Sequence, residues 1–215
     1  MAKRAKSFKY WTSDEVEKVF GIERVYQLDL MDEWLKNDRP VPQEWLPQLT
    51  RIKEELAYKV EYLNEEELKS HYLIPMFDLI NFDDFGRYRT FMGRQLTAEY
   101  EGMLLNGEVD FMVATGKSNP DKPFFFLHEY KQELKRDNDP KGQLLIAMQV
   151  AKLRNENDHT IQGCYIVGRM VFFVLLTNNS YCVSRAFDIT TNDIFYLATI
   201  FQKSKELIIK EVSAL

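Results

Sequence analysis

Hydrophobic residues recur with a helical period through the first third of the chain. Thr12 and Glu15 form a capping-box pair ahead of a short periodic segment, and Gly21 is placed to end that helix. Two further periodic segments, 25–35 and 48–62, are separated by a stretch that contains Pro40, Pro42 and Pro47. Because proline interrupts helices, several short helices are expected here.

Asn64 is placed to cap the next predicted helix, EEELKSHYLIPMFDLI, and Glu67 stands at its capping-box position. At about 100° per residue, Glu65 falls on the stripe that must face the core. That stripe also holds Leu68, Tyr72, Met76 and Leu79. A carboxylate on a core-facing stripe is costly without a partner, so Glu65 is a candidate functional residue. A helix start also attracts acids through its dipole, which is the alternative explanation.

The pattern changes to period two over 94–184, which is typical of strands. Turn signals stand at Asn106-Gly107, at 116–123, at Gly168 and at Asn178-Asn179. A helix opened by Pro140 interrupts the strands, and a last helix follows Thr190 or Thr191. The order of elements indicates a mixed α/β (α+β) fold.

Composition indicates a globular chain with one well-buried core, since 45% of its 215 residues are apolar and 28% are charged. The longest apolar run, Met170 to Leu176, is too short to cross a bilayer, and no apolar signal segment follows the basic start. We therefore expect a cytoplasmic protein without a membrane partner. Cys164 and Cys182 fall in different predicted strands and are expected to be reduced core residues.

A net charge of -5 argues against a protein that holds nucleic acid by its overall charge. Any contact with DNA would have to use local basic patches. The candidates are Lys3, Arg4, Lys6 and Lys9; Arg87, Arg89 and Arg94; and Lys131, Lys135, Arg136 and Lys141. For each patch taken alone, solvated surface charge is the simpler explanation.

Two predicted strands carry the candidate chemistry. In GEVDFMVAT, strict alternation places Val109, Phe111 and Val113 on one face and Asp110 on the other. In PFFFLHEYKQE, the same alternation points Glu129 and Lys131 to one side, away from His128.

The segment between these strands is short enough to close a hairpin centred near Asn119. Such a hairpin brings Asp110 roughly opposite Glu129. Two carboxylates this close repel unless a cation lies between them. Mg²⁺ or Mn²⁺ suits such a pair, with the backbone carbonyl of Tyr130 in the shell and Lys131 beside the attacking water. The alternative is a cross-strand ion pair on a solvated face.

Taken in order, these residues resemble the PD-(D/E)XK nuclease superfamily over about 64–155: Glu65 on a helix, GEVD ending at Asp110, Glu129-Tyr130-Lys131, and Gln143 opening the next helix. The motifs are most similar to those of the N-terminal nuclease modules of restriction-type proteins, with valine before Asp110 where the superfamily has proline.

The resemblance implies a restriction-endonuclease-like αβββαβ core, with a mixed central sheet flanked by helices, Mg²⁺ or Mn²⁺ dependence, and phosphodiester hydrolysis. It implies that Asp110, Glu129 and Glu65 hold the metal, that Lys131 serves the water, and that Gln143 lies beside the site. Gln143 also fits a structural role in the first helical turn. Residues 63–215 would form the nuclease-like domain, and 1–62 a helical N-terminal extension.

The leading hypothesis is a metal-dependent nuclease that acts on DNA, in restriction, repair or defence. The alternative is a catalytically silent nuclease-like fold that binds DNA or a protein, which the acidic net charge favours. The helices before Asn64 fit a lid, a homodimer contact or a substrate-selecting cap, and the sequence does not choose among them.

Overall fold

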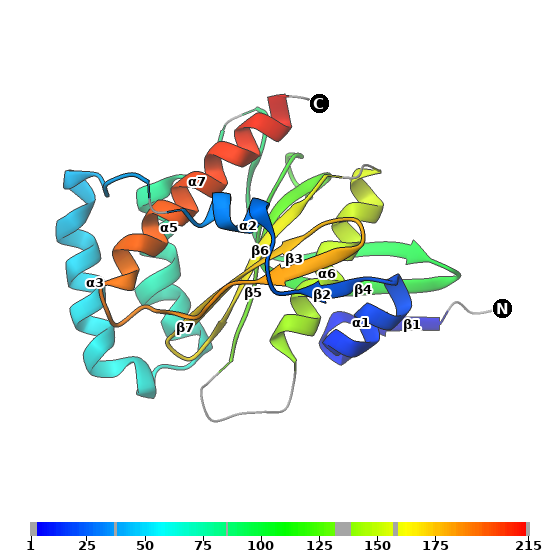
Figure 1. Cartoon of the computed structure of the whole chain (residues 1–215), viewed down its shortest axis with the longest axis horizontal. Helices are drawn as coiled ribbons and strands as arrows, with labels where there is room; N and C mark the ends of the chain where they lie inside the picture. Colours follow the sequence, from blue (N-terminus) through cyan, green and yellow to red (C-terminus); the bar gives the residue numbers. More distant parts are fainter. Residues whose placement is uncertain (1–3, 37, 85, 132–138, 157–158, 214–215) are drawn as a thin grey trace.

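The computed structural model describes residues 4–36, 38–84, 86–131, 139–156 and 159–213, with the backbone alone at Arg4 and at 126–131. Figure 1 shows a central sheet with helices packed against its two faces. The expected mixed α/β class is therefore confirmed. Within the described ranges, no helix is both long enough and apolar enough to span a bilayer.

Seven α-helices lie in the described ranges. They are α1 (Ser13–Phe20), α2 (Asp29–Trp34), α3 (Leu46–Lys59), α4 (Glu65–Leu68), α5 (Ile74–Ile80), α6 (Pro140–Asn155) and α7 (Asp193–Ser213). Short 3-10 turns cover Phe8–Tyr10, Gln43–Trp45 and Val60–Tyr62, and a π-helical segment at Lys69–Leu73 joins α4 to α5.

Nine strands of the described residues form one mixed sheet, in the order β1-β4-β5-β6-β7-β8-β2, with β3 on β4 and β9 on β7. They are β1 (Arg4–Ser7), β2 (Glu23–Val25), β3 (Arg89–Tyr100), β4 (Met103–Ala114), β5 (Pro123–Lys131), β6 (Ile161–Val167), β7 (Met170–Leu176), β8 (Ser180–Val183) and β9 (Phe187–Asp188). The three strands β3, β4 and β5 form an antiparallel meander, and β6 then returns parallel to β5 after α6. A helix between two parallel strands is the usual way to make such a crossover.

The first 62 residues also supply strands, which their helical periodicity did not predict. The strand β1 pairs parallel with β4, and β2 pairs parallel with β8. Both are short, so neither contains enough residues for an alternating pattern to stand out.

Each face of the sheet has its own hydrophobic core. One core joins α2, α3, α5 and α7 to the sheet, with Trp34, Leu56, Phe77 and Phe201 at its centre. The other joins α1 and α6 to the opposite face, with Phe8, Trp11 and much of α6. Cys164 and Cys182 are buried and not disulfide-bonded, as expected.

The predicted helix ends are confirmed where side chains specify them. Thr12 with Glu15, and Asn64 with Glu67, each form a complete capping box. Gly21 ends α1 in the left-handed conformation, with a φ of 63°.

The turn expected at Asn106-Gly107 is wrong, because both residues lie inside β4. The turn lies instead at Glu101 and Gly102, where φ is 46° and 77°. Gly107 serves packing, since a Cβ there would lie 2.3 Å from Cγ of Phe8. A glycine inside a strand can mark close packing as well as a turn.

The π-helical segment Lys69–Leu73 has a clear local cause. Pro75 stands at the start of α5 and has no N–H to give to the preceding turn. The N–H of Ile74 instead donates to the carbonyl of Lys69, five residues back. Such widened turns are frequent at functional sites.

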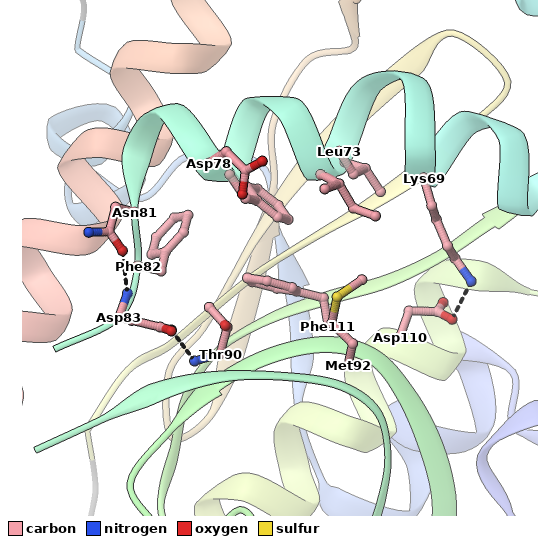
Figure 2. Close-up of a pocket in the computed structure, with 12 residues that line it drawn as sticks. Lys69, Leu73, Asp78, Asn81, Phe82, Asp83, Thr90, Met92, Asp110 and Phe111 are labelled. Atoms are coloured by element: carbon pink, nitrogen blue, oxygen red, sulfur yellow. Dashed lines mark hydrogen bonds and ion pairs between the residues drawn. The ribbon is translucent and has the colours of Figure 1, made fainter. Parts of the chain in front are cut away.

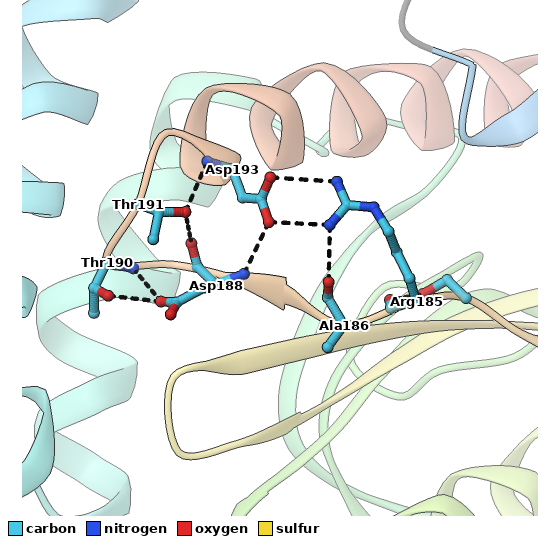
Figure 3. A network of polar contacts seen from close by, with 7 residues as sticks. Arg185, Ala186, Asp188, Thr190, Thr191 and Asp193 are labelled. Atoms are coloured by element: carbon cyan, nitrogen blue, oxygen red, sulfur yellow. Dashed lines mark hydrogen bonds and ion pairs between the residues drawn. The ribbon is translucent and has the colours of Figure 1, made fainter.

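A polar network fixes the start of α7 (Figure 3). The Asp193 carboxylate accepts from the Arg185 guanidinium at 3.1 and 3.3 Å and from the Asp188 N–H at 3.1 Å. The Asp188 carboxylate in turn accepts from the Thr190 N–H and hydroxyl at 2.8 and 2.6 Å. Burial raises the pKa of Asp193, but hydrogen bonds to Arg185 and to the Asp188 N–H outweigh it, so the pKa lies below its usual range.

Asp139 ties the start of α6 to the start of α1. Its carboxylate accepts from the N–H and hydroxyl of Ser13 at 2.7 and 2.6 Å and from the N–H of Gly142 at 2.9 Å. Gly142 permits this approach, since a Cβ there would lie 2.6 Å from the Ser13 nitrogen. The junction places Gln143, the next residue, against the sheet.

The Asp139 junction makes an acid-dependent contribution to stability. Burial raises the pKa of Asp139, but hydrogen bonds from Ser13 and Gly142 outweigh it and hold the pKa below its ordinary value of 3.8. A carboxyl with a depressed folded pKa stabilises the fold above its unfolded pKa, and this stabilisation disappears as the pH falls through the folded pKa.

Asp139→Asn should therefore lower the melting temperature at neutral pH and reduce its loss on acidification. Melting curves of both proteins between about pH 7 and pH 2 measure this. Parallel curves for variant and wild type would contradict the assignment.

Candidate functional site

A cleft opens where β4 changes its neighbour. The edge of β4 opposite β3 pairs with β1 over Met103 to Asn106 and with β5 from Phe111 onward. Residues 107–110 lie at the changeover. Between the end of β1 and the start of the β5 pairing, no described strand pairs with this edge of β4, so side chains from several elements meet there.

The cleft has a volume of about 440 Å³, and we call it the polar cleft. Its described lining comes from β1, the 3-10 turn Phe8–Tyr10, β3, β4, α4 and α6, and consists of Ser7, Lys9, Glu65, Gln95, Asn106, Gly107, Glu108, Asp110 and Gln143. Three residues predicted from the sequence, namely Glu65, Asp110 and Gln143, therefore line one cleft although they come from three separate elements.

Lys69 connects two of these residues. Its ammonium lies 2.9 Å from Oδ1 of Asp110, 3.0 Å from Oε1 of Glu65 and 3.1 Å from Oε1 of Glu66. The side chains of Lys69 and Asp110 are 16% and 17% exposed, so their contact is largely shielded from water, whereas Glu66 is 83% exposed. Glu65 and Asp110 thus converge on one cation.

The charge of Lys69 is strongly favoured in this position. Burial alone lowers the pKa of the Lys69 ammonium, but hydrogen bonds and charge from Asp110 and Glu65 outweigh it and raise the pKa well above its usual range. The group therefore stays protonated at all physiological pH values.

Gln143 is buried, with 2% of its surface exposed. It lines the polar cleft, and its Nε2 has no hydrogen-bond partner among the described residues. A buried amide donor without a partner is costly unless a ligand or water meets it. Gln143 therefore suits a group that accepts a hydrogen bond inside the cleft.

The side chains of Glu129 and Lys131 lie outside the described residues, and the backbone around them is described. Pairing of Phe111 with Leu127 and of Val113 with Phe125 confirms the hairpin centred at Asn119. Between His128 and Tyr130 the pairing with β6 shifts register. The expectation that Glu129 and Lys131 share a face, with the Tyr130 carbonyl beside them, assumed unbroken alternation and stays a prediction.

The expected face of Val109 is wrong. Val109 packs in the core under α6 together with Met112, whereas Phe111 packs in the opposite core. Gly93 stands across from Asp110 in the β3–β4 pair and has a φ of 56°. A left-handed glycine bends a strand, so strict alternation fails at this position. Asp110 lies at the bend.

Glu65 and Asp110 carry oxygen donors of the type that hard divalent cations use. Mg²⁺ is commonly held by one or two carboxylates, several waters and substrate oxygens. Glu65 and Asp110 already share one cation, the ammonium of Lys69. Within the described residues no group of three or more potential protein ligands is present. The third carboxylate predicted from the sequence is Glu129, whose side chain lies outside the described residues.

A second hollow, which we call the apolar groove, adjoins the polar cleft at Asp110. Figure 2 shows the residues that line the groove. It has a volume of about 180 Å³. Lys69 lines the groove and forms an ion pair with Asp110, the residue that the two hollows share. The walls of the groove are Leu73, Ile74, Phe77, Phe82, Met92 and Phe111, and its other end carries Asp78, Asn81, Asp83 and Thr90. In Figure 2 the helical run of Lys69–Leu73 and α5 lies above the groove. Thr90 and Met92 of β3 and Phe111 of β4 point toward the groove from below.

The basic residues predicted to contact DNA lie in different surroundings. Lys9 lines the polar cleft, whereas Lys6 forms an ion pair with Glu15 at 2.8 Å. Arg87 and Arg89 line a third hollow with Lys117, although Arg87 is paired with Asp84. This basic hollow shares Asp83 with the apolar groove.

Among the described residues, Lys69 is the charged partner of Glu65 and Asp110 that the sequence interpretation missed. A local signal was present, because Glu65 and Lys69 have the i,i+4 spacing of a helical ion pair. Its contact with Asp110, 41 positions away, depends on the tertiary fold.

Comparison of the chain with protein-family models and with curated proteins finds no match.

Proposed function

We propose that the chain is a Mg²⁺- or Mn²⁺-dependent nuclease that hydrolyses DNA phosphodiester bonds. The observation that carries the proposal is the convergence of Glu65, Asp110 and Gln143 in the polar cleft. Glu65 and Asp110 were selected from their positions on a predicted helix and a predicted strand, and Gln143 because the order of the three resembles the PD-(D/E)XK superfamily.

The order of elements supports a restriction-endonuclease-like core. The helical run from α4 to α5 is followed by β3, β4 and β5, then α6 and β6. This is the αβββαβ order that the resemblance implies, with β5 and β6 parallel.

The roles follow from the chemistry of each group. Glu65 and Asp110 would hold the metal together with Glu129, and the metal when bound would polarise a phosphoryl oxygen and acidify a bound water. The Gln143 amide would donate a hydrogen bond to a phosphate oxygen or to a water. Lys131 would position the attacking water and balance charge on the phosphate as it becomes pentavalent.

Incubation of the purified protein with linear, circular and single-stranded DNA, with and without Mg²⁺ or Mn²⁺, tests the proposal. We expect metal-dependent cleavage that falls about 100-fold or more in Lys131→Ala. Lys122→Ala, a lysine of the β4–β5 loop, is the matched control and should cleave like wild type. Equal rates for wild type and Lys131→Ala would refute the assignment.

The second candidate is a catalytically silent nuclease-like fold that binds DNA or a protein. The net charge of -5 and the ammonium already held by Glu65 and Asp110 favour it. A silent scaffold has no need of metal, so calorimetric titration with Mn²⁺ separates the two candidates. Heat of binding that disappears in Asp110→Asn supports the nuclease.

A further inference from the structure

The apolar groove is open to solvent at one end of the candidate site. Ile74 on α5 and Met92 on β3 line it and remain 40% and 50% exposed. Large apolar side chains exposed together beside a polar site often mark a ligand contact. The π-helical segment Lys69–Leu73 forms the wall where the groove meets the polar cleft.

The groove is too small for a whole ligand of ordinary size. Its volume of about 180 Å³ lies below the range of about 300–1,000 Å³ that is typical of sites for complete small molecules. It therefore suits one flat ring that belongs to a larger ligand, while the rest of that ligand lies in the neighbouring hollows.

The charges along the groove favour a base over a phosphate. Figure 2 shows Asp78 and Asp83 toward the end of the groove remote from Lys69, and carboxylates there repel a phosphate. Ionised carboxylates only accept hydrogen bonds, so they suit the exocyclic amino group of cytosine or adenine. Thymine offers a carbonyl oxygen in place of that amino group.

The hollows on either side suit the rest of a nucleic-acid strand. At one end, the groove meets the polar cleft at Lys69 and Asp110. At the other end, it shares Asp83 with the basic hollow that contains Arg87, Arg89 and Lys117. A strand could thus have one phosphate at the cleft, one base in the groove and later phosphates near the basic hollow.

We propose that the apolar groove binds one unpaired base of a DNA strand, next to the phosphate that is cleaved, and prefers cytosine or adenine to thymine. The inference rests on the proposed function and deepens it, since a base held this way must be unstacked and unpaired. The protein then acts on single strands or frayed ends in preference to closed duplex.

Binding of fluorescently labelled dC, dA and dT oligomers and of a blunt duplex, followed by anisotropy with a chelator present, tests the inference without cleavage. We expect dC and dA to bind about fivefold or more tightly than dT, and the duplex to bind most weakly, in line with the size of base contacts in single-strand sites.

Three variants separate the base contact from general charge. Met92→Ala and Ile74→Ala should weaken dC and dA binding by about tenfold and reduce the preference over dT. Lys117→Ala should weaken all single strands alike, because a phosphate contact does not read bases. Tyr58→Ala, 87% exposed on α3 and outside the three hollows, is the matched control and should bind like wild type.

Each result decides the matter. Equal binding of all oligomers, no binding of any oligomer, or wild-type binding by Met92→Ala and Ile74→Ala overturns the inference. If metal-dependent cleavage is found while binding ignores the base, the groove assignment alone fails. If the base preference is found without any metal-dependent cleavage, the proposed function fails and the groove remains a binding site.

Discussion

Asp110→Asn should abolish metal-dependent DNA cleavage, with a loss of well over 100-fold. Asparagine keeps the shape of the side chain and removes the charge that a divalent cation needs. Even changes to groups behind metal ligands cost about 10–100-fold in affinity or activity, so loss of a direct ligand should cost more. Cleavage rates in Mn²⁺ and the heat of Mn²⁺ binding measure the effect.

Asp121→Asn is the matched control, since Asp121 is an exposed aspartate of the β4–β5 loop. It should cleave DNA and bind Mn²⁺ like wild type. A melting curve of metal-free Asp110→Asn shows whether the fold survives, since Lys69 keeps its contacts with Glu65 and Glu66. A folded Asp110→Asn protein that binds Mn²⁺ with unchanged affinity would remove Asp110 from the metal site.

The sequence predicted those parts of the fold that short stretches of chain determine. The capping boxes at Thr12 and Asn64 depend on residues three positions apart, so both could be predicted without the tertiary structure. The β4–β5 hairpin could be predicted because its loop is short and rich in turn residues. Glu65 was selected because a carboxylate interrupted an otherwise apolar stripe, and it is half-buried at the cleft.

The errors arise where distant residues decide the local structure. Asn106-Gly107 has the composition of a turn. Gly107 instead allows the ring of Phe8 to pack against β4, and Phe8 is distant from it in the sequence. The sequence of β4 alone predicts that Val109 shares a face with Phe111. The left-handed Gly93 on β3 bends the two strands, and Val109 packs in the opposite core. Neither partner can be recognised from the residues beside the affected position.

The polar cleft and the apolar groove share Asp110, and Asp110 is paired with Lys69, a residue that the sequence interpretation missed. The site could therefore be predicted only in part. The carboxylates attracted attention because their types and order suggested metal chemistry. A lysine one turn after an acidic helix start has a common structural explanation as a surface ion pair. Its burial beside Asp110 separates Lys69 from that ordinary case.

Lys69→Met should tighten Mn²⁺ binding by about tenfold, the opposite of the effect of Asp110→Asn. The Lys69 ammonium is bonded to the same carboxylates, Glu65 and Asp110, that are proposed to hold the metal. A divalent ion must therefore displace it or compete with it. Because the pair with Asp110 is largely buried, its loss costs more than the about 0–1 kcal/mol of an exposed pair. A tenfold change corresponds to about 1.4 kcal/mol.

The same substitution should lower the melting temperature without metal, since it removes one cation from a cluster of carboxylates, and Mn²⁺ should restore more stability to the variant than to wild type. Lys59→Met is the matched control, because Lys59 forms an i,i+4 ion pair with Glu55 outside the polar cleft and the apolar groove. It should leave Mn²⁺ affinity unchanged. Weaker Mn²⁺ binding by folded Lys69→Met would mean that the lysine supports the metal site, and unchanged binding would mean that the metal lies elsewhere.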